Sequence, residues 1–112
     1  DKIAASLSTL AAYPGRLIVM FQPHGFGPMK MMRREITDAF AQNLRDHDII
    51  TMPEIFYAGG SVTRDISAQD LINDIAGQGR DARFFPTRDQ CAAMMLDEAR
   101  PGDRLVVMGA RD

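Results

Sequence analysis

The sequence predicts an α/β domain of the Rossmann-like, three-layer kind, in which a mostly parallel sheet is flanked by helices. Apolar runs at residues 17–21 and 105–108 are unbroken, as is typical of strands that are covered on both faces of a sheet. Stretches with helical spacing alternate with short apolar runs, and the turns between them are short. This alternation predicts parallel strands joined by right-handed crossovers.

The first half of the chain contains two helical patterns and two strand patterns. A first helix is indicated by the spacing of Ile3, Leu7, Leu10 and Ala11, and it ends at Pro14-Gly15. A strand over 17–21 stops at Pro23. The longest helical pattern follows, with an apolar face formed by Met29, Met32, Ile36, Phe40 and Leu44. We expect a second strand over 49–52, ended by Pro53.

The second half repeats this alternation. Ser67 and Asp70 are spaced as an N-cap pair before a helix with the apolar stripe Leu71, Ile72 and Ile75, which ends at Gly77 and Gly79. A short strand over 82–85 comes next. Thr87 and Gln90 form a second capping box, and the helix after it should turn Cys91, Met94, Met95 and Ala99 inward until Pro101-Gly102 ends it. The last strand covers 104–108.

Composition limits the classes of function. A length of 112 residues predicts one domain, and a net charge of -2 gives no reason to expect binding to nucleic acid or to an anionic membrane. The single Cys91 favours a reducing, cytoplasmic setting, and no apolar run approaches the roughly 20 residues that cross a bilayer. The chain starts at Asp1 within a helical pattern, so we expect it to be excised from a larger protein.

His24 is the leading candidate for ligand contact. It follows Pro23 at the end of the first strand and precedes Gly25, so it lies where central strands of α/β sheets meet their ligands. The alternative is a histidine that only caps the turn. A basic cluster follows nearby, formed by Lys30, Arg33 and Arg34. These side chains either offset a bound anion or form a solvated face paired with Glu35 or Asp38, and the sequence favours neither alternative.

Two further loops could share this edge. The loop at 57–61 (YAGGS) either lets backbone amides approach a ligand or only makes a turn, and residues 109–112 follow the last strand. If the strands are parallel, those last residues face the same edge as His24. The chain contains no P-loop, no G-x-G-x-x-G sequence and no Cys/His spacing suited to zinc, so we expect neither a self-contained nucleotide site nor a metal site.

Four short sequences carry a resemblance to a known family over nearly the whole chain. They are FQPH at 21–24 with an aromatic residue at Phe26, IFYAGG at 55–60, PGD at 101–103 and MGA at 108–110. With them the chain resembles the C-terminal domain of the Mur ligases, most nearly the branch that adds L-alanine to UDP-N-acetylmuramate. The resemblance implies a domain of an ATP-dependent carboxylate-amine ligase of peptidoglycan precursor synthesis, a cytoplasmic cell-wall pathway.

In that family an acyl phosphate forms on the nucleotide sugar and is attacked by the acceptor's amino group. The resemblance implies that ATP and magnesium are bound mainly by a central domain outside this chain, and the UDP sugar by an N-terminal domain. Residues 1–112 would bind the amino-acid or peptide acceptor and close the active site. We therefore expect no catalytic residue, metal or cofactor in this chain, and no activity of it alone.

The resemblance assigns acceptor binding to a set of six residues: His24, Gly25, Phe26, Lys30, Gly59 and Arg111. The chain departs from the family where arginines usually follow the histidine, because Gly25 and Pro28 stand at those positions. Arg111 replaces a usual glycine and could supply a compensating cation. Two alternatives stay open: a non-catalytic binding or regulatory paralogue, and a ligase for a peptide or another acceptor.

Overall fold

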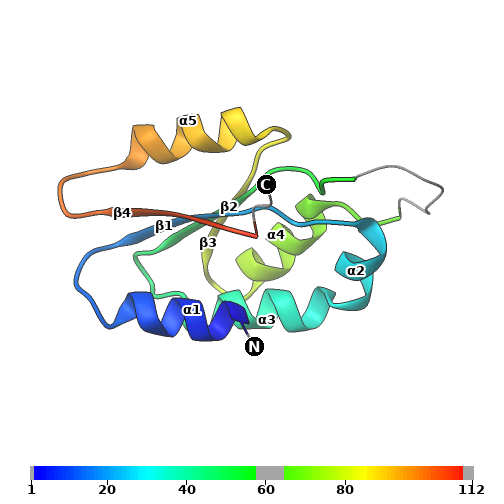
Figure 1. Ribbon diagram of the computed structural model, residues 1–112, viewed down its shortest axis with the longest axis horizontal. Coiled ribbons are helices and arrows are strands. Elements are labelled where there is room, and N and C mark those ends of the chain that lie inside the picture. The colour runs from blue at the N-terminus through cyan, green and yellow to red at the C-terminus, as the bar shows by residue number, and fades with distance from the viewer. Residues whose placement is uncertain (1, 58–64, 110–112) are drawn as a thin grey trace.

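The computed structural model describes residues 2–57 and 65–109 and contains a four-stranded sheet in the order β3-β2-β1-β4 (Figure 1). The elements in chain order are α1 (Lys2–Ala11), β1 (Leu17–Phe21), α2 (Phe26–Met31), α3 (Arg33–Asn43), β2 (Ile49–Met52), α4 (Ala68–Gly77), β3 (Asp81–Phe84), α5 (Arg88–Glu98) and β4 (Arg104–Met108). Every strand pair in this sheet is parallel. The predicted α/β fold is therefore confirmed.

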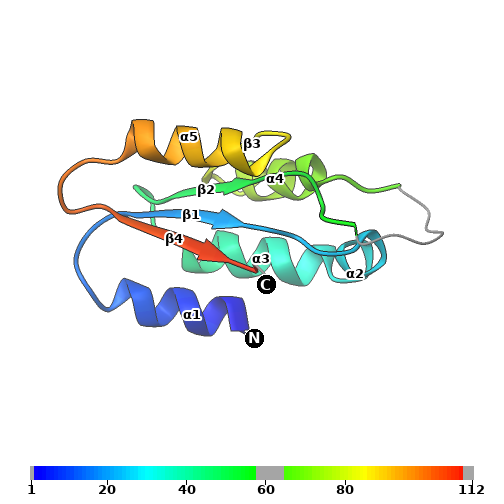
Figure 2. The same ribbon diagram turned by 45° about the horizontal axis from the view of Figure 1, so that its top comes forward.

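Helices cover both faces of the sheet. Figure 1 shows α5 alone on one face and α1, α3 and α4 on the other, and Figure 2 shows β4 at the side of the sheet nearest α1. The chain crosses the sheet in one direction from β1 to β3 and returns to β4. Because crossovers are right-handed, this reversal places α5 on the face opposite α3 and α4.

The central position of β1 explains its unbroken apolar sequence. Leu17, Val19 and Phe21 belong to the larger core cluster beneath α1, α3 and α4. Ile18 and Met20 point to the other side, where they pack with Cys91 and Met95 of α5. All five residues of the strand are buried.

β4 has a similar apolar sequence but lies at the edge of the described sheet. Its burial alternates: Leu105 is 44% exposed and Val107 is 51% exposed, while Val106 and Met108 pack partly against the larger core. The expectation that this run is covered on both faces is therefore wrong for the described residues. Leu105 and Val107 pair with Ile18 and Met20, but the described contacts of α5 with the sheet are mainly to β1 and β2.

The long helix expected from Met29 to Leu44 is divided into α2 and α3. Met32 separates them with φ -102° and ψ 13°, which departs from helical backbone angles. Hydrogen bonds continue across it, from the Met32 N–H to the Pro28 carbonyl and from the Ile36 N–H to the Met32 carbonyl, both at 2.9 Å. The break turns Met32 outward to 46% exposure, while Met29 stays buried at 7%.

Both predicted capping boxes are present, at Ser67 with Asp70 and at Thr87 with Gln90. α5 ends at Glu98, so Ala99 is its C-cap and is exposed rather than inward-facing. In the part of the chain that the structure describes, no helix is both long and apolar enough to cross a membrane.

Charged side chains hold the amino ends of the strands. The buried Asp48 carboxylate accepts hydrogen bonds from the backbone N–H of Leu17 at 2.9 Å and of Arg45 at 2.8 Å, and from the Arg45 guanidinium at 3.0 Å and 3.2 Å. Arg104 donates to three carbonyls at and after the end of α1, those of Leu10, Tyr13 and Gly15.

Candidate functional site at the carboxyl edge of the sheet

The chain passes very close to itself where β1 and β4 end. The Gln22 N–H donates to the Met108 carbonyl at 2.9 Å, which extends the pairing of the two strands by one residue. Gly109, with φ 74°, lies so near that a β-carbon there would be 2.6 Å from the Gln22 carbonyl oxygen. The sheet therefore brings the two strand ends to one edge, as predicted. In α/β sheets such an edge, where the strand order reverses, is a common place for ligands.

His24 lies two residues further along this edge and is paired with the loop that follows β2. The Phe56 N–H donates to the Pro23 carbonyl at 2.9 Å, and the Gly25 N–H donates to the Phe56 carbonyl at 2.8 Å. The rings of His24 and Phe56 meet edge to face, with centroids 5.4 Å apart and planes inclined by 67°. His24 is half-buried, while Phe56 is 54% exposed.

Gly25 connects this pairing to α2. Its φ of 78° is rarely adopted by residues with side chains, and a β-carbon would approach Cδ of Pro28 to 3.1 Å. Phe26, the first residue of α2, is buried, and its ring packs edge to face on Tyr57 with centroids 5.7 Å apart. Residues 24–26 and 56–57 thus form one aromatic unit, which places His24 and the start of α2.

Glu54 and Gln22 brace the same edge from within, and sequence reasoning missed both. The Gln22 amide donates to the carbonyls of Pro23 at 2.9 Å and of Glu54 at 3.2 Å. The Glu54 carboxylate accepts from the N–H groups of Ile55 and Ala68 and from the Ser67 hydroxyl, so it joins this loop to the start of α4. Burial raises the pKa of Glu54, but these hydrogen bonds outweigh it and the pKa is lowered.

Lys30 projects from α2 and forms an ion pair with Asp65, just before α4. The hydrogen bond from the Lys30 ammonium lowers the pKa of Asp65. Arg33, at the start of α3, makes two hydrogen bonds to Asp74 of α4, at 2.7 Å and 3.0 Å. Carboxylates of this chain therefore compensate both cations. They come from α4 and the segment before it, not from Glu35 or Asp38.

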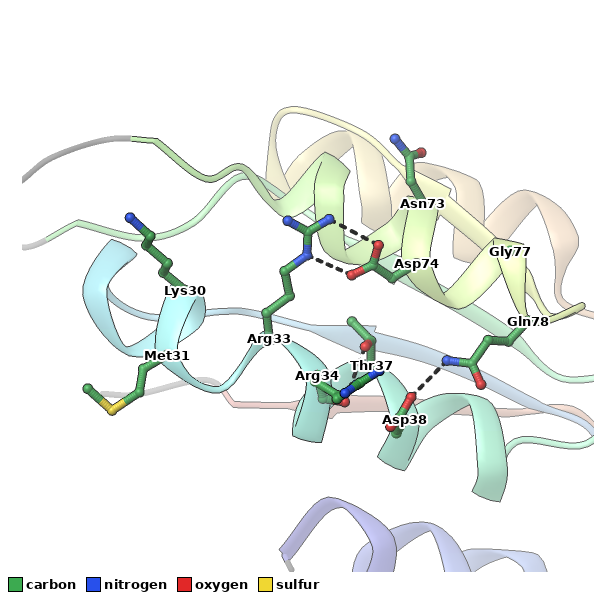
Figure 3. A pocket seen from close by; sticks show the side chains of 10 residues that line it. All are labelled: Lys30, Met31, Arg33, Arg34, Thr37, Asp38, Asn73, Asp74, Gly77 and Gln78. Carbon is green, nitrogen blue, oxygen red and sulfur yellow. Dashed lines mark hydrogen bonds and ion pairs between the residues drawn. The ribbon is translucent and has the colours of Figure 1, made fainter.

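A groove between α2–α3 and α4 contains this basic cluster. Figure 3 shows the guanidinium of Arg33 reaching across it to Asp74, with Gln78 bonded to Asp38 further along. Arg34 is exposed and lines the same groove. Since Arg33 spans the groove in an ion pair, the arrangement joins two helices and leaves little positive charge from that side chain for a bound anion.

The structure describes four of the six residues that the resemblance assigns to acceptor binding. His24, Gly25 and Phe26 share the aromatic unit, and Lys30 lies on the same short helix as Phe26. Gly59 and Arg111 lie outside the described residues. Phe56 was not singled out from the sequence. Its signal was an aromatic residue just after a buried strand, in the loop that leads to the two glycines.

Within 2–57 and 65–109, no group of three or more His, Cys, Asp or Glu side chains is placed to hold a metal ion. At the starts of α4 and α5 the hydroxyls of Ser67 and Thr87 accept from the backbone N–H groups of Gln69 at 3.0 Å and of Gln90 at 3.1 Å.

The all-parallel sheet with helices on both faces defines a Rossmann-like α/β domain. The chain belongs to the Mur ligase family: residues 1–111 match the family described as "Mur ligase, glutamate ligase domain".

Three similar proteins from different bacteria carry the same name. A UDP-N-acetylmuramate--L-alanine ligase of Lachnospira eligens is 33% identical over 100% of this chain and 24% of its own length. The protein of that name from Agrobacterium fabrum is 33% identical over 88% of this chain and 20% of its own. That from Rickettsia bellii is 30% identical over 98% of this chain and 23% of its own. The chain thus spans about a quarter or less of these relatives.

Proposed function

We propose that this chain is the acceptor-binding C-terminal domain of a larger, cytoplasmic, ATP-dependent carboxylate-amine ligase of peptidoglycan precursor synthesis. It contributes the acceptor site and closes the active site, and residues 1–112 alone are inactive. The observation that carries this proposal is the braced edge at His24, which lies at the end of the central strand of a domain that matches the Mur ligase family over residues 1–111.

In this proposal His24 orients the acceptor, with Gly25 and Phe26 shaping the turn beside it. Arg111 offsets the negative charge of the acceptor, or Lys30 does so by exchanging its exposed partner Asp65 for the acceptor's carboxylate. Gly59 lets the backbone approach the acceptor. None of these residues takes part in bond making. ATP, magnesium and the UDP sugar bind to other domains of the whole protein, where the nucleotide supplies the phosphoryl group that activates the sugar's carboxylate.

Domain closure has a clear physical purpose in such a reaction. An activated carboxylate is open to attack by water, so the reaction needs water excluded until the amine arrives. Holding the amine in line with the activated carbon also replaces a bimolecular encounter with an intramolecular one. A rigid edge serves this purpose, because Phe56 holds His24 both through backbone hydrogen bonds to Pro23 and Gly25 and through contact of the two rings.

The test is release of ADP by the full-length protein, supplied with ATP, magnesium, UDP-N-acetylmuramate and a panel of amino acids and short peptides. We expect ADP release and amide formation that depend on one class of amine. Reactions without amine and without the UDP sugar are the controls. If a folded, ATP-binding protein shows no amine-dependent ADP release, the proposal is wrong and a regulatory paralogue is favoured.

The panel also separates the acceptor classes. The residues that follow His24 differ from the usual family pattern, in that Gly25 and Pro28 stand where arginines are usual. A peptide that supports faster turnover than any single amino acid would identify a peptide-adding ligase. A preference for L-alanine would show that this departure leaves the usual acceptor unchanged.

A further inference from the structure

We propose that Phe56 determines acceptor specificity at this edge, and that it favours an amine whose side chain is apolar and larger than a methyl group. This inference rests on the proposed function and names the substrate class for the same site. The structural basis is the contact of the half-exposed Phe56 ring with His24. The turn that follows His24, residues 25–28, carries no charged side chain.

Phe56 is rigidly placed yet open to solvent. Its backbone N–H and carbonyl are both used in pairing with residues 23–25, and its ring packs on His24, so neither the chain nor the ring is free to turn inward. The residue is nevertheless 54% exposed. A fixed and exposed aromatic surface beside the acceptor-orienting residue is suited to pack against an apolar group of that acceptor.

The turn beside Phe56 offers no charged side chain that would draw a polar acceptor side chain away from the ring. Residues 25–28 are uncharged, and the positive φ of Gly25 together with the proximity of Pro28 excludes a strain-free side chain at position 25. Lys30 and Arg33, which follow, are already paired with Asp65 and Asp74. A cation elsewhere would attract the carboxylate that all amino acids share, whereas contact with Phe56 distinguishes their side chains.

The size preference follows from the area of the ring. A methyl group covers little of a phenyl face, while the side chain of leucine or phenylalanine covers much more of it. Full burial of one CH2 group changes an affinity by about fourfold, so leucine, which has three more carbons than alanine, gains about tenfold even when the ring covers only half of them. We therefore expect the full-length protein to bind L-leucine and L-phenylalanine at least about tenfold more tightly than L-alanine.

The experiment measures binding of L-alanine, L-leucine and L-phenylalanine to the full-length protein by calorimetry, alongside ligation. Phe56→Ala should weaken binding of all three amino acids, because its ring also packs on His24. The loss should be at least about tenfold larger for L-leucine and L-phenylalanine than for L-alanine, which removes most of the preference. Phe56→Leu should keep part of the preference. Leu96→Ala is the matched control, because Leu96 is a 69% exposed apolar residue. It belongs to α5, which covers the face of the sheet opposite α1, α3 and α4. If Phe56→Ala does not fold, Phe56→Gln makes the same test with a polar side chain of similar length.

Equal affinity of the wild-type protein for the three amino acids, or binding of none, would overturn the inference. So would a Phe56 variant that weakens all three equally, because that result indicates a purely structural role. Ligation with L-alanine preferred would contradict this inference and leave the proposed function intact. A size preference in binding without any ligation would support the role of Phe56 and contradict the proposed ligase function.

Discussion

The carboxylate of Asp48 accepts a hydrogen bond from the backbone N–H of Leu17 at 2.9 Å, and so joins the starts of β1 and β2. The side chain of Asp48 is fully buried, and Arg45 is its charged partner. Asp48→Asn keeps the size but removes the charge. We expect it to lower the free energy of unfolding by about 3 kcal/mol, because it leaves Arg45 without its partner. Urea unfolding at pH 7 measures this, and Asp46→Asn, at an exposed carboxylate, should leave the midpoint unchanged.

The same carboxylate makes stability depend on pH in a defined direction. Burial raises the pKa of Asp48, but hydrogen bonds from Arg45 and Leu17 outweigh it, so the pKa is lower in the folded chain. Its stabilisation is complete above the unfolded-state pKa, near 4, and is lost as pH falls through the folded-state pKa. The stability gap between wild type and Asp48→Asn should therefore shrink below about pH 4. A gap that is constant from pH 7 to pH 3 would contradict this assignment.

Two glycines of the turn after His24 should respond oppositely to alanine. Gly25→Ala places a β-carbon at positive φ and against Pro28, so it should destabilise the fold by about 1–2 kcal/mol. In Gly27→Ala the added β-carbon meets no atom within 4 Å beyond its chain neighbours Phe26 and Pro28 and the backbone of its own helix, and position 27 lies inside α2, so the change should stabilise by about 0.5 kcal/mol. Urea midpoints of the two variants test this pair. A neutral Gly25→Ala would mean that the backbone at this turn differs from the one described.

Valine-to-threonine changes distinguish the two apolar strands. Val19 of β1 is 0% exposed, so Val19→Thr buries a hydroxyl and should lower stability by about 2 kcal/mol. Val107 of β4 is 51% exposed, and Val107→Thr should change stability by less than about 0.5 kcal/mol. Thermal unfolding of both variants measures the difference, and equal losses would show that β4 is covered in solution.

These strands also show what sequence reasoning could and could not predict about the fold. The runs LIVMF and LVVM look equally buried, because an apolar run records hydrophobicity and not the neighbours of a strand. Right-handed crossovers predict helices on both faces, but the strand order decides that β1 is central and β4 is an edge in the described sheet. Likewise, spacings of three and four residues continue through Met32, so periodicity could not reveal the break between α2 and α3.

The sequence could predict those parts of the candidate site that depend on where a residue follows a strand. It could not predict the parts that depend on contacts between segments far apart in the chain. His24 follows a central strand, and that alone placed it at the carboxyl edge of the sheet. Phe56 and Glu54 act through contacts with residues 22–25, which exist only because the loop after β2 runs on beside β1. Lys30 and Arg33 were recognised as a basic cluster, but their partners Asp65 and Asp74 come from a later part of the chain.

The two histidines of the chain allow the most direct test of the acceptor edge. In the full-length protein, amine-dependent ADP release should be measured for wild type, His24→Ala and His47→Ala. We expect His24→Ala to raise the KM for the amine about tenfold or more, as loss of one orienting hydrogen bond would, with the KM for ATP unchanged. His47, an exposed residue before β2, should tolerate alanine. Equal amine KM and turnover in all three proteins would contradict the assignment of the acceptor site to this edge.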